Sequence, residues 1–100
     1  MNIYENIPKT LDEEEIKQIA SFKDVRIERI ISTGQTSDWY DQDEDEWVCL
    51  LQGEAVLEFE DSAKKKLRAG DTIFLKAHLK HRVAHTSSNP QCIWLCVFSK

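Results

Sequence analysis

From residue 25 onward, apolar residues alternate with polar residues or form short runs of the length of a β-strand. Residues with β-branched side chains are frequent there, and the runs recur at intervals of about eight to twelve residues, as in all-β sandwiches and barrels. The pattern predicts strands at 25–32, 46–52, 54–60, 64–68, 72–76, 80–86 and 92–98. Turn residues such as Gly34, Gly53 and Gly70 separate several of these runs.

The pattern before residue 25 is different. Thr10 and Glu13 have the spacing of a capping box, in which each side chain satisfies a free backbone amide of the other. This predicts a helix that starts at Leu11 and ends near Ser21, with an apolar stripe on one side. We therefore expect residues 1–24 to form an extended segment and a short helix that pack on a β-barrel made by residues 25–100.

Two of the predicted strands, within 47–51 and 93–98, are apolar on both faces. Each therefore needs cover from the barrel interior and from something outside it. A symmetric homodimer that packs these outer faces together is the economical arrangement. The N-terminal segment and helix are the alternative cover for one of them in a monomer.

The composition narrows the classes of partner. The chain has 18 acidic and 13 basic residues and a net charge of -5, with acids concentrated at 41–46. No broad basic surface is expected, so nucleic acid is an unfavourable partner. No apolar stretch is long enough to span a bilayer, and residues 1–8 do not resemble a signal peptide. Three cysteines without a Cys-x-x-Cys pair fit a reducing compartment, so we expect a cytoplasmic protein with no membrane partner.

Two motifs place polar residues beside strands that end or begin at a glycine. In the first, six residues separate Glu46 from Gly53; in the second, the spacing from Gly70 leads to His78, His81 and His85. These spacings resemble the paired motifs of the cupin superfamily over about residues 25–98. The phrases WYDQDEDEWV and AHxxHRV further resemble a subgroup of short bacterial cupins. The resemblance implies a double-stranded β-helix, or jelly roll, with the functional site inside the barrel.

The first motif departs from the family at the positions of two metal-binding histidines. In cupins these histidines, a glutamate and the later histidine bind a divalent transition metal. The corresponding positions here hold Tyr40 and Gln42, or Trp39 and Asp41 with the longer family spacing. The resemblance therefore leaves one carboxylate and one imidazole of the set, Glu46 and His81.

If residues 40–46 are extended, Tyr40, Gln42, Glu44 and Glu46 share one face of the segment. We expect this face to point into the barrel, so that Tyr40, Gln42 and Glu46 meet His81. This oxygen-rich set would be weak for zinc or copper and more suitable for iron, manganese or nickel. The alternative is a site without metal, in which Glu46 and His81 form a buried acid and base pair.

Five further residues are expected at the same pocket. Val48 and Leu50 share the face of Glu46, and Val83 and His85 share the parity of His81. Trp39 is expected either to close the mouth of the barrel or to touch a ligand.

Two functions are compatible with such a pocket. An enzyme would use Glu46 and His81 as catalytic groups in isomerisation, elimination or oxygenation of a small molecule. A binding module would hold a small ligand in the same cavity, as a sensor or accessory subunit without the metal. The sequence does not choose between them and indicates no substrate.

Overall fold

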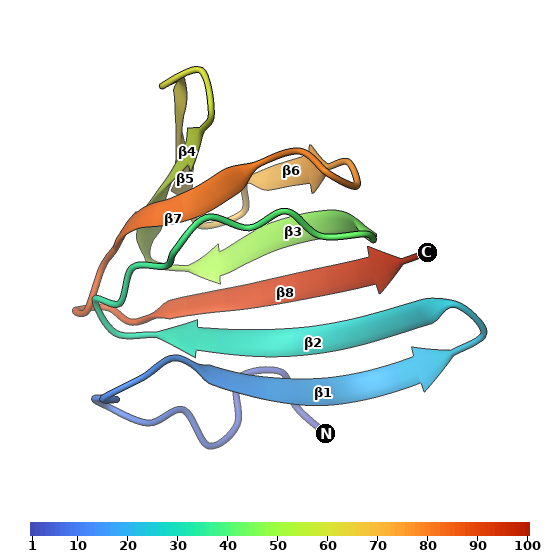
Figure 1. The fold of residues 1–100 in the computed structure, drawn as a ribbon. Coiled ribbons are helices and arrows are strands. Elements are labelled where there is room, and N and C mark those ends of the chain that lie inside the picture. The colour runs from blue at the N-terminus through green and yellow to red at the C-terminus, as the bar shows by residue number, and fades with distance from the viewer.

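The computed structural model describes all 100 residues and contains eight β-strands in two sheets (Figure 1). The strands are β1 (Glu15–Phe22), β2 (Val25–Ser32), β3 (Asp45–Gln52), β4 (Glu54–Phe59), β5 (Lys64–Arg68), β6 (Thr72–Leu75), β7 (His81–Thr86) and β8 (Cys92–Ser99). The all-β prediction is confirmed, and each predicted strand from residue 25 onward begins and ends within one residue of its observed bounds. The structure has no helix that could cross a membrane.

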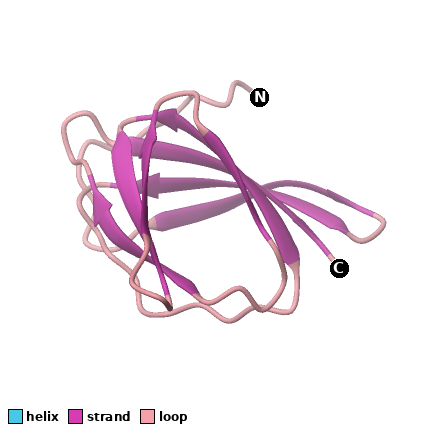
Figure 2. Ribbon diagram, turned by 90° about the horizontal axis from the view of Figure 1, so that it is seen from above, coloured by secondary structure: helices cyan, strands magenta, loops and turns pink.

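The sheets have the orders β1-β2-β8-β3-β6 and β5-β4-β7. Neighbouring strands are antiparallel, and several neighbours are far apart in the sequence, such as β2 and β8. Seen from above, the two sheets face each other as the walls of a barrel (Figure 2). The chain between β2 and β3 runs along β7 and closes one side of this barrel, through an isolated bridge between Tyr40 and His81.

The predicted N-terminal helix is wrong. Residues 15–22 form β1, which pairs along β2 with one register shift between Gln18 and Ala20. An isolated helix of about eleven residues is marginal in water. The exposed edge of β2, in contrast, offers unpaired backbone groups along its whole length. Pairing with that edge gives hydrogen-bond partners to backbone amide and carbonyl groups of residues 15–22. No helix follows Thr10, so its side chain does not act as a helix cap.

The core lies between the two sheets. Alternate residues of β3 and β8 point inward and form one cluster with residues of β4, β5 and β6. Its buried members are Val48, Leu50, Ala55, Leu57, Leu67, Leu75, Cys92, Trp94, Cys96 and Phe98. These strands therefore form a rigid apolar wall on which a site can be built.

The N-terminal segment covers part of the outer face of the five-stranded sheet. Arg29 of β2 points to this side and is only 1% exposed. Its Nη1 group donates hydrogen bonds to the carbonyl oxygens of Ile3, at 3.1 Å, and Glu5, at 2.6 Å. Ile31 and Ile93, which face each other across β2 and β8, are also buried there. The N-terminal segment therefore lies on this outer face, whereas β1, which replaces the predicted helix, extends the sheet beside β2 and does not cover that face.

The other part of that outer face remains uncovered. Trp47 of β3 and Phe74 of β6 are paired neighbours, and they are 39% and 58% exposed. The predicted homodimer would bury this part of the face, and it stays a prediction.

Candidate functional site

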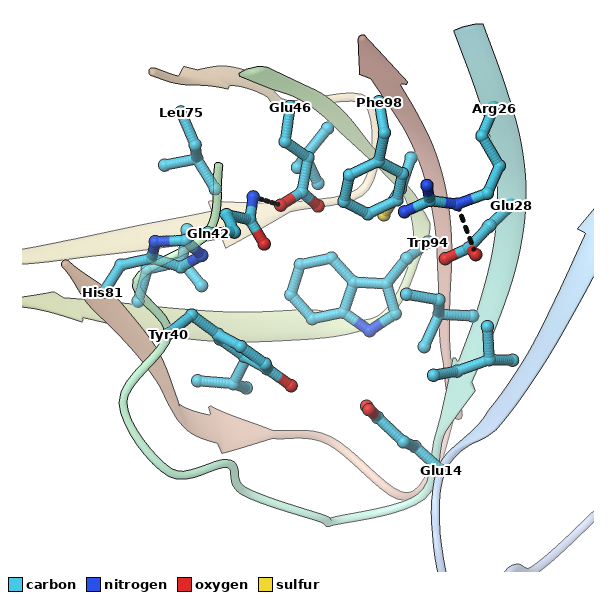
Figure 3. Close-up of a pocket in the computed structure, with 16 residues that line it drawn as sticks. Glu14, Arg26, Glu28, Tyr40, Gln42, Glu46, Leu75, His81, Trp94 and Phe98 are labelled. Carbon is cyan, nitrogen blue, oxygen red and sulfur yellow. Dashed lines mark hydrogen bonds and ion pairs between the residues drawn. The ribbon is translucent and has the colours of Figure 1, made fainter. Parts of the chain in front are cut away.

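A cavity of about 200 Å³ lies inside the barrel, between the two sheets. Ten of the sixteen residues that line it are hydrophobic. The six polar ones are Glu14, Arg26, Glu28, Gln42, Glu46 and His81. Figure 3 shows their side chains around the ring of Trp94. At about 30 Å³ per water molecule, the space suits a small molecule and not a polymer.

The segment before β3 brings Tyr40 beside His81. The backbone amide of Tyr40 donates to the carbonyl of His81 at 2.7 Å, and the amide of His81 donates back to Tyr40 at 3.2 Å. Their rings are 5.4 Å apart between centroids. Ser37 extends the contact, because its amide and hydroxyl oxygen both bond to the backbone of Val83. Two parts of the chain about forty residues apart are thereby joined at the cavity wall.

Glu46 is a buried carboxyl group on the inner face of β3. It is 8% exposed, and its backbone neighbours are Leu75 on β6 and Phe98 on β8. The side-chain amide of Gln42 donates a hydrogen bond to Oε1 of Glu46 at 2.9 Å. Burial raises the pKa of Glu46, and the hydrogen bond from Gln42 only partly opposes this.

His81 is the buried imidazole of the site, at 4% exposed. Its Nδ1 atom lies 2.8 Å from the carbonyl oxygen of Leu79. A carbonyl can only accept, so Nδ1 carries the proton of that bond. In the neutral ring, Nε2 then has a free lone pair and no partner within the protein. The turn before β7 thus sets the tautomer of a group that lines the cavity.

Four predicted site residues, Tyr40, Gln42, Glu46 and His81, line this one cavity, as do Val48 and Val83. Glu44, which shares their parity, instead accepts hydrogen bonds from Arg26 at 3.1 Å and does not line the cavity.

Three predicted pocket residues lie elsewhere. Leu50 is fully buried in the core beyond the cavity. Trp39 is exposed, with the guanidinium of Arg82 5.8 Å from its ring centre. His85 is also exposed and outside the cavity.

A β-bulge explains the position of His85. Leu57 pairs with Val83, but the preceding residue of β4, Val56, pairs with His85. The extra residue on β7 is Ala84, which reverses the alternation of side chains. Val83 therefore points inward and His85 outward, although regular parity puts both on one face. Nothing in the residue types of β7 marks the bulge.

Sequence reasoning missed the polar residues of β1 and β2. Arg26 and Glu28 of β2 and Glu14, just before β1, line the cavity. On β2 the more apolar parity contains Val25 and Ile27, which favours the opposite orientation. The N-terminal segment covers that apolar face from outside, so the polar residues are left to face the cavity.

On the side of the cavity formed by β2 and the residues before β1, some charged side chains have ion-pair partners and others have none. Arg26 donates to Glu28 at 2.9 Å and to Glu44, and it lies 4.3 Å over the ring of Phe98. Glu14 has no hydrogen bond or ion pair; burial, and then the charge of Glu28, raises its pKa. Burial also raises the pKa of Tyr40, with the charge of Glu14 as the second cause. The cavity is therefore acidic and holds little positive charge of its own.

The cupin domain profile matches residues 28–98. The chain belongs to the cupin domain family. No protein of curated function matches it. The finer resemblance to a subgroup of short bacterial cupins stays a prediction.

Several solved structures share this fold. A crystal structure from Ralstonia eutropha JMP134, described as a putative mannose-6-phosphate isomerase, is 38% identical, with a TM-score of 0.94 over 100% of this chain and 96% of that one. A conserved protein of unknown function from Streptococcus pyogenes, SPY1581, is 19% identical, with a TM-score of 0.79 over 100% and 85%. A cupin superfamily protein from Desulfitobacterium hafniense DCB-2 is 20% identical, with a TM-score of 0.71 over 88% and 77%. The last two likenesses concern the fold alone.

Membership of the cupin family implies a divalent metal. We therefore ask whether the side chains of the cavity are suitable ligands for such an ion. The predicted ligands are His81, Glu46, Gln42 and Tyr40, but no three His, Cys, Asp or Glu side chains come close enough to share an ion. Only His81 and Glu46 are common ligands for iron, manganese or nickel. The Gln42 amide is turned with its N–H toward Glu46. These side chains therefore fit a divalent metal poorly.

Proposed function

We propose that the protein binds a small polar molecule inside the barrel, and that Glu46 and His81 are the groups that recognise it without a metal. The observation that carries this proposal is the pair itself. Both side chains are almost completely buried, both line one cavity, and each retains acceptor capacity that the protein does not use. Their free acceptor atoms face the cavity, where a ligand that donates hydrogen bonds can satisfy them in place of water.

The same pair has the chemistry of an acid and a base. A carboxyl group with a raised pKa can donate a proton, and a neutral imidazole with a free Nε2 can accept one. A binding site of this kind can therefore also act on its ligand by moving a proton.

Isomerisation of a sugar phosphate is the second candidate, favoured by the description of the 38% identical Ralstonia eutropha protein as a putative mannose-6-phosphate isomerase. Such a substrate carries a dianionic phosphate, which proteins bind with arginine, lysine or backbone amides. Arg26 is the only arginine or lysine that lines the cavity, and its guanidinium already donates hydrogen bonds to Glu28 and Glu44. The charge of the cavity therefore argues against this candidate, and conversion of mannose 6-phosphate by the purified protein would establish it.

The test is a screen of small polar molecules by protein NMR, on protein purified without a histidine tag and analysed for metals. We expect binders that shift the Trp94 indole signal, which is assigned once Trp39→Phe and Trp47→Phe identify the other two. Affinity should fall about tenfold or more in Glu46→Gln and in His81→Asn. His85→Asn, an exposed histidine on the same strand, is the matched control.

Two results would contradict the proposal. One is a screen in which binders leave the cavity signals unchanged, or bind equally well to Glu46→Gln and His81→Asn. The other is stoichiometric iron, manganese or nickel in the purified protein that is lost in both variants, which would return the metal-dependent alternative.

A further inference from the structure

The hydrogen-bonding groups that the cavity leaves unused are mainly acceptors. Nε2 of His81 has no partner, because Nδ1 is the atom bound to Leu79. The carboxylate of Glu14 has no partner, and that of Glu46 has the amide of Gln42. A ligand that satisfies these groups must donate hydrogen bonds, and an ammonium group is a donor with three N–H bonds and no acceptor.

The charge of the lining favours the same class. Three carboxyl groups, Glu14, Glu28 and Glu46, line the cavity together with one guanidinium. That guanidinium is Arg26, and its hydrogen bonds go to Glu28 and Glu44. Glu14 and Glu46 are therefore left without a cationic partner. Burial raises the pKa of each, and at Glu46 the hydrogen bonds from Gln42 and Cys96 and the charge of His81 oppose this only in part.

Aromatic rings supply the remaining surface. In Figure 3 the ring of Trp94 lies in the middle of the cavity, with Tyr40 beside it and Glu14 and Glu46 on different sides. Phe98 already receives the guanidinium of Arg26 on its face, 4.3 Å from the ring centre. Aromatic faces attract organic cations, with tryptophan the strongest, and they also accept apolar carbon atoms.

We propose that the cavity takes a small organic cation, a protonated amine with a short apolar body, whose ammonium group meets Glu14 or Glu46 and whose carbon atoms pack on Trp94. This inference rests on the proposed function and names its ligand class. Anionic ligands such as sugar phosphates are excluded by the same charges, because they would meet carboxylates without a free cation.

The experiment compares three probes on the unmodified protein at pH 7.5, by NMR titration of the cavity signals. The probes are 3-methylbutan-1-amine, which is protonated at this pH, its neutral counterpart 3-methylbutan-1-ol, and mannose 6-phosphate. The first two differ mainly in charge. We expect the amine to bind at least about tenfold more tightly than the alcohol, since a hydrogen bond to a charged group is stronger than a neutral one. Mannose 6-phosphate should leave the cavity signals unchanged.

If the ammonium group meets Glu14, Glu14→Gln should weaken the amine about tenfold and leave the alcohol unchanged. If it meets Glu46, the loss of about tenfold should appear in Glu46→Gln instead, and a loss in neither variant would overturn the inference. Glu13→Gln is the matched control, because it removes the same charge one residue away, at an exposed position outside the cavity. Thermal unfolding of these variants would establish that they are folded. Equal weakening by Glu14→Gln and Glu13→Gln would mean that only net charge matters, and would overturn the assignment of Glu14.

Tighter binding of the alcohol or of mannose 6-phosphate than of the amine would also overturn the inference. If that binding still depended on Glu46 and His81, the proposed small-molecule function would stand and only the ligand class would be wrong. If no probe shifted the cavity signals, the organic-cation inference would fail, and the broader screen would decide the proposed function separately.

Discussion

Arg29 and Glu46 are two buried ionisable side chains on opposite faces of the same five-stranded sheet. Arg29 points outward, where the N-terminal segment covers it and supplies two backbone carbonyl oxygens. Glu46 points inward, where the protein supplies the amide of Gln42 and then an open cavity. One group is enclosed by its own chain, whereas the other faces space that the chain does not fill.

This difference separates a structural role from a functional one. Burying a charge is unfavourable unless hydrogen bonds compensate for the lost water. At Arg29 the compensation comes from carbonyl groups of the N-terminal segment, although Nε has no partner, and these bonds hold that segment against the barrel. At Glu46 the hydrogen bond from Gln42 opposes the effect of burial on the pKa only in part, and the remaining acceptor capacity faces the cavity. Three predictions test this contrast, and a fourth tests the part of the outer face that the N-terminal segment leaves uncovered.

The largest effect is expected for Arg29→Met, which keeps much of the side-chain volume and removes the donors. The carbonyl groups of Ile3 and Glu5 would lose their partner, and unfolding free energy should fall by about 2–3 kcal/mol. Urea denaturation measures this, and hydrogen exchange should accelerate in residues 1–9. Arg68→Met, at an exposed arginine, is the control and should change stability little. A loss no larger than that of the control would show that the outer face does not depend on Arg29.

Phe74→Glu tests the uncovered part of the outer face. If a homodimer buries Trp47 and Phe74, a carboxylate there should weaken dimerisation at least about tenfold, because it would be desolvated without a partner. Light scattering after size-exclusion chromatography measures the mass. Phe22→Glu is the control, since Phe22 is exposed on the strand at the opposite edge of the sheet. A monomeric wild-type protein would refute the predicted dimer.

Glu46→Gln should have a smaller effect on stability, and of opposite sign to Arg29→Met. Burial raises the pKa of Glu46, so the folded protein takes up a proton more readily than the unfolded chain. The stabilisation by the protonated form is complete below the ordinary carboxyl pKa and is lost as pH rises through the raised pKa of the folded state. Glutamine cannot ionise, so the variant should melt a few degrees higher than wild type at about pH 8, since about 1 kcal/mol shifts a domain of this size by about 4–8 °C.

At acidic pH this gain should disappear, because wild-type Glu46 is then protonated as well. Thermal unfolding followed across the pH range provides the comparison. Glu60→Gln, at an exposed carboxyl, is the control. A variant that is less stable than wild type at alkaline pH would show that ionised Glu46 stabilises the fold, contrary to its proposed role.

The smallest effect is expected for Glu15→Gln. Glu15 is the ion-pair partner of Arg29, but the distance is 3.5 Å and its side chain is 42% exposed. Ion pairs in which a partner is exposed to solvent at such a distance are weak, and surface pairs contribute about 0–1 kcal/mol. The loss in urea denaturation should be at most about 0.5 kcal/mol, and added salt should not enlarge it. A loss as large as that of Arg29→Met would mean that the ion pair, and not the backbone carbonyls, compensates the buried guanidinium.

Parity along strands predicted part of the site. The sequence placed Tyr40, Gln42 and Glu46 on one face, and all three line the cavity with His81. Glu46 follows the regular alternation of β3, whereas a bend at Asp43 and Glu44 interrupts the segment before it. Parity was wrong for His85, where the bulge at Ala84 reverses the faces. Parity was also wrong for Glu44, whose side chain accepts hydrogen bonds from Arg26 of β2 and does not line the cavity.

The sequence by itself determined the strands from residue 25 onward and the face of Glu46, because strand periodicity and turn residues are local properties of the chain. Only the tertiary structure decided that residues 15–22 form a strand, since the open edge of β2 is what stabilises it. It also decided which face of β2 lines the cavity, because the segment held by Arg29 covers the other face. Both outcomes depend on contacts between segments far apart in the sequence, and those contacts outweigh local preference.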